Sequence, residues 1–185
     1  MSLSPRRLGR AALFLLAVAG LAVAAPVRAQ DPPAELSLPD LNGFVTNRLR
    51  VALSIAGADS MQAGTIDLEF DPAVVTPLPL TLVPGSLGQA LPGIWGASLP
   101  AAGVFRIAFS TPDVTGFVGS GTLCTFDVDL IAAGTSPLVF RSILLERTPN
   151  IQLPATGQDG SITAAPLAVD AATWGRVKRL FGAPR

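Results

Sequence analysis

Short runs of alternating apolar and polar residues are the feature that most limits the folds open to this chain. In TIDLEF (65–70), for example, every second residue is apolar, which is the period of a β-strand with one buried face. Gly, Pro and Asp interrupt the runs, and no helical pattern of ten or more residues occurs before residue 170. These signals predict an all-β, antiparallel sandwich. The strand candidates are residues 35–38, 47–57, 65–70, 103–110, 121–130, 136–146 and 160–165.

The charge of the chain is balanced overall but unevenly distributed. The 185 residues include 13 basic and 13 acidic ones, yet residues 30–169 hold five Arg, no Lys and twelve acids. This central body therefore carries a formal charge of about −7. Such a charge disfavours nucleic acid as a partner, because the phosphate backbone would repel it. The length fits one domain, which we expect to span residues 30–166.

The first 29 residues have the three parts of a secretory signal peptide. Three arginines form a charged start, residues 11–25 form an apolar run, and small residues precede a cleavage point after Ala29. The run has 15 residues, whereas a membrane-spanning helix needs about 20. We therefore predict a signal helix at 1–29, exported by an ordinary or a twin-arginine route. Its cleavage would leave a secreted or cell-surface bacterial protein with no membrane span.

Residues 167–185 are predicted to form a linker and a short basic tail. Asp170 can cap a helix over residues 170–181, which would place Trp174 and Phe181 on one face and arginines on the other. Two interpretations stay open. The tail packs on the domain or is disordered, or it serves as an amphipathic element for a membrane surface or an assembly partner.

Two carboxylates, Asp67 and Glu69, stand two residues apart in one strand candidate. A glycosidase also uses a pair of carboxylates, but it places them across a cleft and raises the pKa of one. Here the alternation puts both on the face opposite Ile66, Leu68 and Phe70. We therefore predict that they lie on the solvated side of a strand.

Other residues that carry catalysis or bind metals are sparse. The chain has no histidine, and its one cysteine, Cys124, occupies an apolar-face position, which predicts a small buried hydrophobe. Asp159 stands alone before a glycine, as is typical of a turn. We expect no enzyme activity, no catalytic residue, no metal site and no cofactor.

The order of these signals resembles the cohesin domain family. Residues 47–87 are similar to the front half of a cohesin, in which an alternating strand precedes a Gly-containing strand that ends in an aromatic residue and Asp-Pro. Residues 103–140 resemble the back half, with RIAF, GSGTL and AGTSPL in sequence. QDGSITA (158–164) matches the closing strand. The resemblance covers about residues 36–165.

The resemblance implies a nine-strand jelly-roll sandwich and a role as a non-catalytic binding module. Cohesins hold dockerins, which are small calcium-loaded modules on polysaccharide-degrading enzymes, and thereby assemble extracellular complexes. The contact surface would include the outward positions of the strand at 63–70, with a rim charge from a neighbouring strand. The implied partner-binding residues are Ala63, Thr65, Asp67, Glu69 and Arg106.

Two alternatives stay open beside dockerin binding. Cohesins are related in fold to carbohydrate-binding modules, and an exposed Trp95 would be the sugar contact if polysaccharide is the ligand. The third interpretation is a surface structural or assembly domain that has lost dockerin recognition. It is raised because well-known cohesins carry a polar Asn-x-Asp pair where this chain has Ala63 and Thr65.

Overall fold

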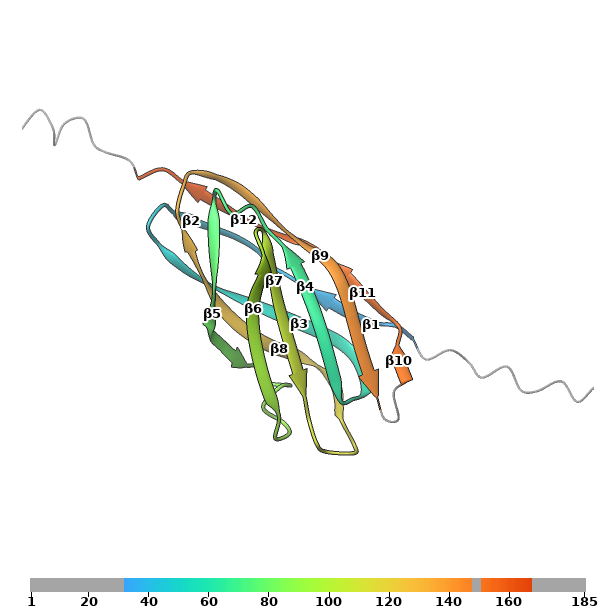
Figure 1. The fold of residues 1–185 in the computed structure, drawn as a ribbon. Helices are drawn as coiled ribbons and strands as arrows, with labels where there is room; N and C mark the ends of the chain where they lie inside the picture. The colour runs from blue at the N-terminus through green and yellow to red at the C-terminus, as the bar shows by residue number, and fades with distance from the viewer. Residues whose placement is uncertain (1–31, 148–150, 168–185) are drawn as a thin grey trace, which may run out of the picture. The chain divides into compact units, whose positions relative to one another are not determined.

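The computed structural model of the chain describes residues 32–147 and 151–167, and every helix or strand within these ranges is a β-strand (Figure 1). The all-β prediction is therefore confirmed for this part of the chain. The predicted signal peptide at 1–29 and the predicted tail helix at 170–181 lie outside the described residues.

One layer of the sandwich is a five-stranded sheet in the order β11-β1-β3-β8-β5. Its two longest strands, β3 and β8, pair over almost their whole length at its centre. The strands are β1 (Ala34–Ser37), β3 (Arg48–Met61), β5 (Val75–Pro84), β8 (Phe117–Leu130) and β11 (Ala155–Gln158).

The other layer is a seven-stranded sheet in the order β2-β12-β9-β4-β7-β6, with β10 paired to β9 beside this path. The chain passes from one sheet to the other at Leu38 and Pro39, which separate β1 from β2. The strands are β2 (Asp40–Phe44), β4 (Ala63–Glu69), β6 (Ile94–Ala101), β7 (Val104–Ser110), β9 (Gly134–Arg147), β10 (Ile151–Leu153) and β12 (Gly160–Ala165).

The sandwich departs from the expected nine antiparallel strands in two respects. The described residues form twelve strands, and the strand candidates read from the alternation do not include β2, β5, β6, β10 and β11. In addition, β1 pairs with β11 and β12 pairs with β2 in parallel. A purely antiparallel sandwich is therefore wrong at these two places, where chain segments far apart in sequence meet.

Aromatic rings fill the space between the two sheets. Phe105 of β7 and Phe126 of β8 meet across the sandwich with ring centroids 4.7 Å apart. Phe109 and Phe117 form a second contact of the same kind at 6.1 Å. Both pairs join one sheet to the other, because β7 belongs to the seven-stranded sheet and β8 to the five-stranded one.

Cys124 is fully buried in this core, as its position in the alternation predicts. Burial raises the pKa of its thiol to about 12, so the group stays protonated at neutral pH. A protonated thiol is a poor nucleophile. Cys124 therefore acts as a small hydrophobe, as predicted.

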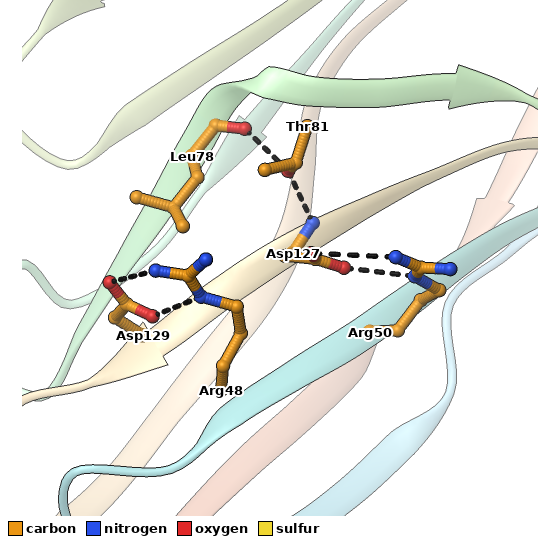
Figure 2. Close-up of polar contacts among 6 residues, drawn as sticks. All are labelled: Arg48, Arg50, Leu78, Thr81, Asp127 and Asp129. Atoms are coloured by element: carbon orange, nitrogen blue, oxygen red, sulfur yellow. Dashed lines mark hydrogen bonds and ion pairs between the residues drawn. The ribbon is translucent and has the colours of Figure 1, made fainter.

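Ion pairs lie on the outer face of the five-stranded sheet, where β3 and β8 run side by side (Figure 2). The Nε of Arg50 lies 2.9 Å from Asp127 and that of Arg48 lies 2.7 Å from Asp129. Both arginines are more than half exposed, and such surface pairs contribute roughly 0–1 kcal/mol each. They reinforce the register of β3 and β8 more than they stabilise the fold.

The neighbouring strand β5 pairs irregularly with β8, because its register shifts between Leu78 and Val83. A hydrogen-bonded threonine lies within this irregular segment. Thr81 donates to the carbonyl of Leu78 at 2.7 Å and accepts from the backbone N–H of Asp127 at 2.8 Å (Figure 2). The bulge at the edge of this sheet is thus attached to β8 although its ladder is interrupted there.

Replacement of Phe126 by alanine tests the position of the core. Phe126 is fully buried, so we expect Phe126→Ala to lower the free energy of unfolding by about 3–5 kcal/mol. Phe44→Ala is the matched control, because Phe44 is 51% exposed and its loss should cost less than about 1 kcal/mol. Urea denaturation measures both, and equal losses would contradict this placement of the core.

Candidate functional site

Four neighbouring strands of the seven-stranded sheet, β6, β7, β4 and β9, present one outward surface. Their pairing places outward side chains in rows that cross the strands. We call this surface the β4 face. Its rows are Ile94, Ser110, Ala63 and Glu146; then Gly96, Ala108, Thr65 and Leu144; then Ser98, Arg106, Asp67 and Ser142; and Glu69 ends β4 beyond them.

The structure brings the five sequence-predicted partner contacts together on this face. Ala63, Thr65, Asp67 and Glu69 are successive outward positions of β4. Arg106 lies directly opposite Asp67 on β7. Their role in binding a partner stays a prediction.

The prediction that Asp67 lies on the solvated side of its strand is wrong, because only 8% of the residue's surface is exposed. The Nε and Nη2 atoms of Arg106 lie 2.7 and 2.8 Å from its two carboxylate oxygens. Hydrogen bonding from Arg106 lowers the pKa of Asp67 below its ordinary value of 3.8, against the opposing effect of burial. Glu69, by contrast, is exposed as predicted. Substitution at Asp67 is therefore not a neutral surface change.

A shallow hollow of about 380 Å³ opens on the β4 face above its smallest side chains. Gly96, Ala108 and Thr65 lie side by side along one row and provide little bulk above the sheet. Exposed aliphatic side chains stand at either side, with Ile94 77% exposed and Leu144 39% exposed. The hollow therefore combines exposed aliphatic side chains with polar ones from Thr65, Ser110 and Glu146.

A second glycine shapes the sheet beneath this hollow. Gly64 faces inward between Ala63 and Thr65, and a Cβ there would lie 2.6 Å from the Phe109 ring and 2.9 Å from Leu145. The absence of a side chain lets the Phe109 ring approach the β4 backbone. Gly64 therefore sets how closely the core packs under the face.

Trp95 belongs to the core side of β6 rather than to an exposed platform. Its ring stacks on Phe109 with centroids 4.8 Å apart and an interplanar angle of 18°. It also meets Phe117 at 6.0 Å. The expectation of an exposed Trp95 is corrected, because the ring is half-buried and one of its faces is occupied.

Sequence reasoning missed Ile94, Ala108, Leu144 and Glu146 as members of this face. The alternation did not place Leu144 on this face, because β9 contains a bulge at which its register with β4 shifts between Asp67 and Leu68. The signal for Ile94 was present, since Ile94, Gly96 and Ser98 alternate with Trp95 and Ala97.

Within ranges 32–147 and 151–167, no three His, Cys, Asp or Glu side chains gather closely enough to hold a metal ion. Over the same residues, no helix has the length and apolar character needed to cross a membrane.

The sequence matches no known protein-family model and no curated protein. The structure is similar to solved cohesins. A non-cellulosomal cohesin from the hyperthermophilic archaeon Archaeoglobus fulgidus has a TM-score of 0.60 and 14% identity, over 78% of this chain and 98% of that chain. A chain of Coh-OlpC–Doc435, a type I cohesin–dockerin complex from Clostridium thermocellum, has a TM-score of 0.63 and 12% identity, over 77% and 100%.

CaCohA2 from Clostridium acetobutylicum, solved in solution, gives a TM-score of 0.60 and 17% identity, over 73% of this chain and 92% of its own. The described part of the chain therefore has a cohesin-like fold, as its sequence motifs predict.

Acid titration tests the pair of Asp67 with Arg106. Because the pKa of Asp67 is lower in the folded than in the unfolded chain, its stabilisation is complete above the ordinary pKa of 3.8 and is lost as pH falls through the folded pKa. We expect Asp67→Asn to lower Tm at neutral pH, with the difference from wild type shrinking in strong acid. Glu69→Gln is the control and should leave Tm nearly unchanged; a pH-independent effect of Asp67→Asn would contradict the assignment.

Glycine substitution tests the packing beneath the hollow. Gly64→Ala places a methyl group against Phe109 and Leu145, and such overpacking costs roughly 1–3 kcal/mol. An added Cβ at Gly96 meets no atom within 4 Å, so Gly96→Ala should change stability by less than about 0.5 kcal/mol. Chemical denaturation of both variants checks the difference, and a neutral Gly64→Ala would show that the core is looser than described.

Proposed function

We propose that this cohesin-like sandwich is an exported, non-catalytic protein-binding module that receives a dockerin-like partner on its β4 face. The single observation that carries the proposal is the match of this fold, over the full length of the neighbour, to a chain of a cohesin–dockerin complex. The predicted signal peptide at 1–29 supports export. The role that follows is the assembly of extracellular polysaccharide-degrading complexes.

The backbone of the β4 face is held by strand pairing, which suits it to docking. Three of its four strands, β4, β7 and β9, are each hydrogen-bonded to a neighbouring strand on both sides. A face built on such strands is formed before the partner arrives, so little conformational entropy is lost on binding. A stable complex of this kind would bury about 1,600 Å² in total.

The hollow with its aliphatic sides supplies the anchor of the proposed interface. Ile94 and Leu144 expose aliphatic surface at its sides, and burial of such surface contributes about 25 cal/mol for each Å² removed from water. Ala63 and Thr65 stand where well-known cohesins carry a polar pair. We infer that the partner of this chain offers an aliphatic side chain to that position rather than a hydrogen-bonding one.

The charged groups of the β4 face fix orientation rather than provide the main affinity. Asp67 is already satisfied by Arg106, so neither group needs the partner in order to be paired. Glu69 is exposed at the end of β4. Together with the net charge of about −7 on residues 30–169, this favours a basic partner surface and an association rate that falls with salt.

The two other interpretations have less support. Sugar binding by Trp95 has less support, because one face of its ring is stacked on Phe109 and the residue is half-buried. A structural domain without dockerin recognition would leave the exposed aliphatic groups around the hollow without a role. Both become outcomes of the following test.

Arginine scanning of the face tests the proposal. Ala108 is exposed at the centre of the β4 face, and Ala108→Arg would fill the hollow with a bulky charged side chain. We expect the purified protein to bind at least one member of a panel of calcium-loaded dockerins. Calorimetric titration should then show a loss of affinity of about tenfold or more for Ala108→Arg, as is usual at the centre of an interface.

Ala56→Arg provides the matched control, because Ala56 is an exposed alanine of β3 in the other sheet. Its affinity should equal that of the wild type. Equal binding by both variants would remove the β4 face from the interaction. Retention on cellulose that is lost in Trp95→Ala, with no dockerin bound, would support the carbohydrate-binding alternative.

A further inference from the structure

The outer side of β2 and β12 is a sheet face that nothing in the described part of the chain covers. The two strands pair in parallel, so their outward side chains stand in rows. Ile162 and Ala164, which alternate with the outward positions of β12, are buried in the core. We call this surface the β12 face. Its residues, all exposed or partly exposed, are Asp40, Asn42, Phe44, Ser161, Thr163 and Ala165.

One end of the β12 face is apolar, and it is the end at which β12 leaves the sheet (Figure 1). Phe44, the last residue of β2, is 51% exposed and lies beside Ala165, the last residue of β12. Leu167, two residues further along the chain, is 56% exposed. Exposed apolar groups that gather in one place mark contact sites. The segment nearest to this one is the chain that continues from Leu167.

The other end of the β12 face is acidic. Asp40, the first residue of β2, is exposed, and its Oδ1 atom accepts a hydrogen bond from the Ser161 hydroxyl at 2.7 Å. Glu69 is a second exposed carboxylate, opposite Val139 of β9, the strand next to β12. Neither carboxylate is ion-paired with a cation of the described residues. The nearest part of β9 carries one cation, Arg141, whose charge acts on Asp67.

The chain that follows Leu167 has the complementary chemistry. Residues 168–185 contain four basic residues and one acidic residue. Trp174, Val177 and Phe181 recur at the spacing of one helix face. A helix of about twelve residues is marginal alone in water, so this pattern needs a surface on which to fold.

We propose that the C-terminal segment 170–181 folds back over the β12 face of its own chain as a short helix. Its apolar side, with Trp174, covers Phe44. Its basic side lies toward Asp40 and Glu69. The folded-back segment also covers β2, a five-residue edge strand, which is one way in which proteins protect a sheet edge.

The dimensions of the face and of the segment agree. Asp40 and Phe44 stand four residues apart along β2, which is about 13 Å. Asp170 and Arg179 are nine residues apart and would be separated by about 13 Å in a helix. The chain from Leu167 to Asp170 reaches at most about 10 Å, which is enough for a turn back over Phe44.

The hollow of the β4 face is out of reach for the apolar start of this segment. Ala164 pairs with Gly134, and Leu144, at the side of the hollow, lies ten residues further along β9, about 33 Å away. Trp174 follows Leu167 by seven residues, which span at most about 25 Å. The segment therefore leaves the hollow open, and this inference does not rest on the proposed function.

Proximity and charge favour the segment's own chain over other occupants of the β12 face. A short linker holds the segment near the face at an effective concentration of about millimolar. A second copy would have to bring together two bodies of about −7 each. An anionic membrane would attract the basic segment but repel the acidic body attached to it.

Hydrogen exchange of the full chain tests the contact with Phe44. We expect the amides of residues 170–181 to exchange about fivefold more slowly than in a synthetic peptide of residues 168–185, because docking holds the helix. Phe44→Ser should abolish this protection. Leu80→Ser is the matched control and should keep it, because Leu80 is a fully exposed residue of β5 in the other sheet.

Charge reversal tests the acidic end of the face. Asp40→Lys should reduce the protection of residues 170–181 by roughly twofold or more, because it replaces an attraction by a repulsion. Glu35→Lys makes the same change of charge at an exposed residue of β1 in the other sheet, and it should have no effect. High salt should weaken the protection in the wild type, because it screens the same charges.

A reciprocal experiment reads the face itself without changing any residue of the sandwich. Hydroxyl radicals oxidise exposed phenylalanine side chains. We expect Phe44 to be oxidised more slowly in the wild type than in Trp174→Ser, because the segment covers its ring.

Four results would overturn the proposal. The first is exchange of residues 170–181 in the full chain at the rate of the free peptide, and the second is protection that survives Phe44→Ser. The third is protection that appears only when phosphatidylglycerol vesicles are added, which would identify a membrane as the occupant. The fourth is protection that rises with protein concentration, which would identify a second copy. None of these results depends on the dockerin titration, so this inference and the proposed function can fail separately.

Discussion

The central place of β4 in the seven-stranded sheet is the constraint on which the rest of the molecule depends. Ile66 and Leu68 are fully buried between the sheets, and a strand cannot bury them without turning the residues between them outward. Because β7 and β9 flank β4 in fixed register, the same burial also fixes which side chains of those strands accompany them. The β4 face is thus the outer side of the core packing rather than a separate feature added to it.

Three sides of the sandwich differ in charge, and each difference has a structural consequence. The outer face of the five-stranded sheet carries cross-strand ion pairs, which satisfy its charges internally. The β4 face has the pair of a nearly buried Asp67 with a half-exposed Arg106, beside the hollow. The side formed by β5 and β6 has no charge at all. The β4 face also carries the carboxylates of Glu69 and Glu146, so a partner that docks there meets negative charge beside the hollow.

Alternation predicted much of the fold because it reports directly on burial. It placed Phe126 and Cys124 in the core and put Thr65 and Glu69 on the outward side of β4. It failed where a side chain's surroundings depend on a different strand. The carboxylate of Asp67 is outward yet covered, because Arg106 happens to lie opposite it. Leu144 is outward because a bulge in β9 reverses the parity between Leu138 and Leu145, both of which are buried.

The sequence by itself determined the all-β class, most of the strands and the resemblance to cohesins, because period-two burial and turn residues are local properties that each run expresses alone. Only the tertiary structure decided which strands are neighbours. That decision assembled the hollow from four strands and turned Trp95 toward Phe109. These outcomes depend on long-range pairing and register, which no short stretch of sequence encodes on its own.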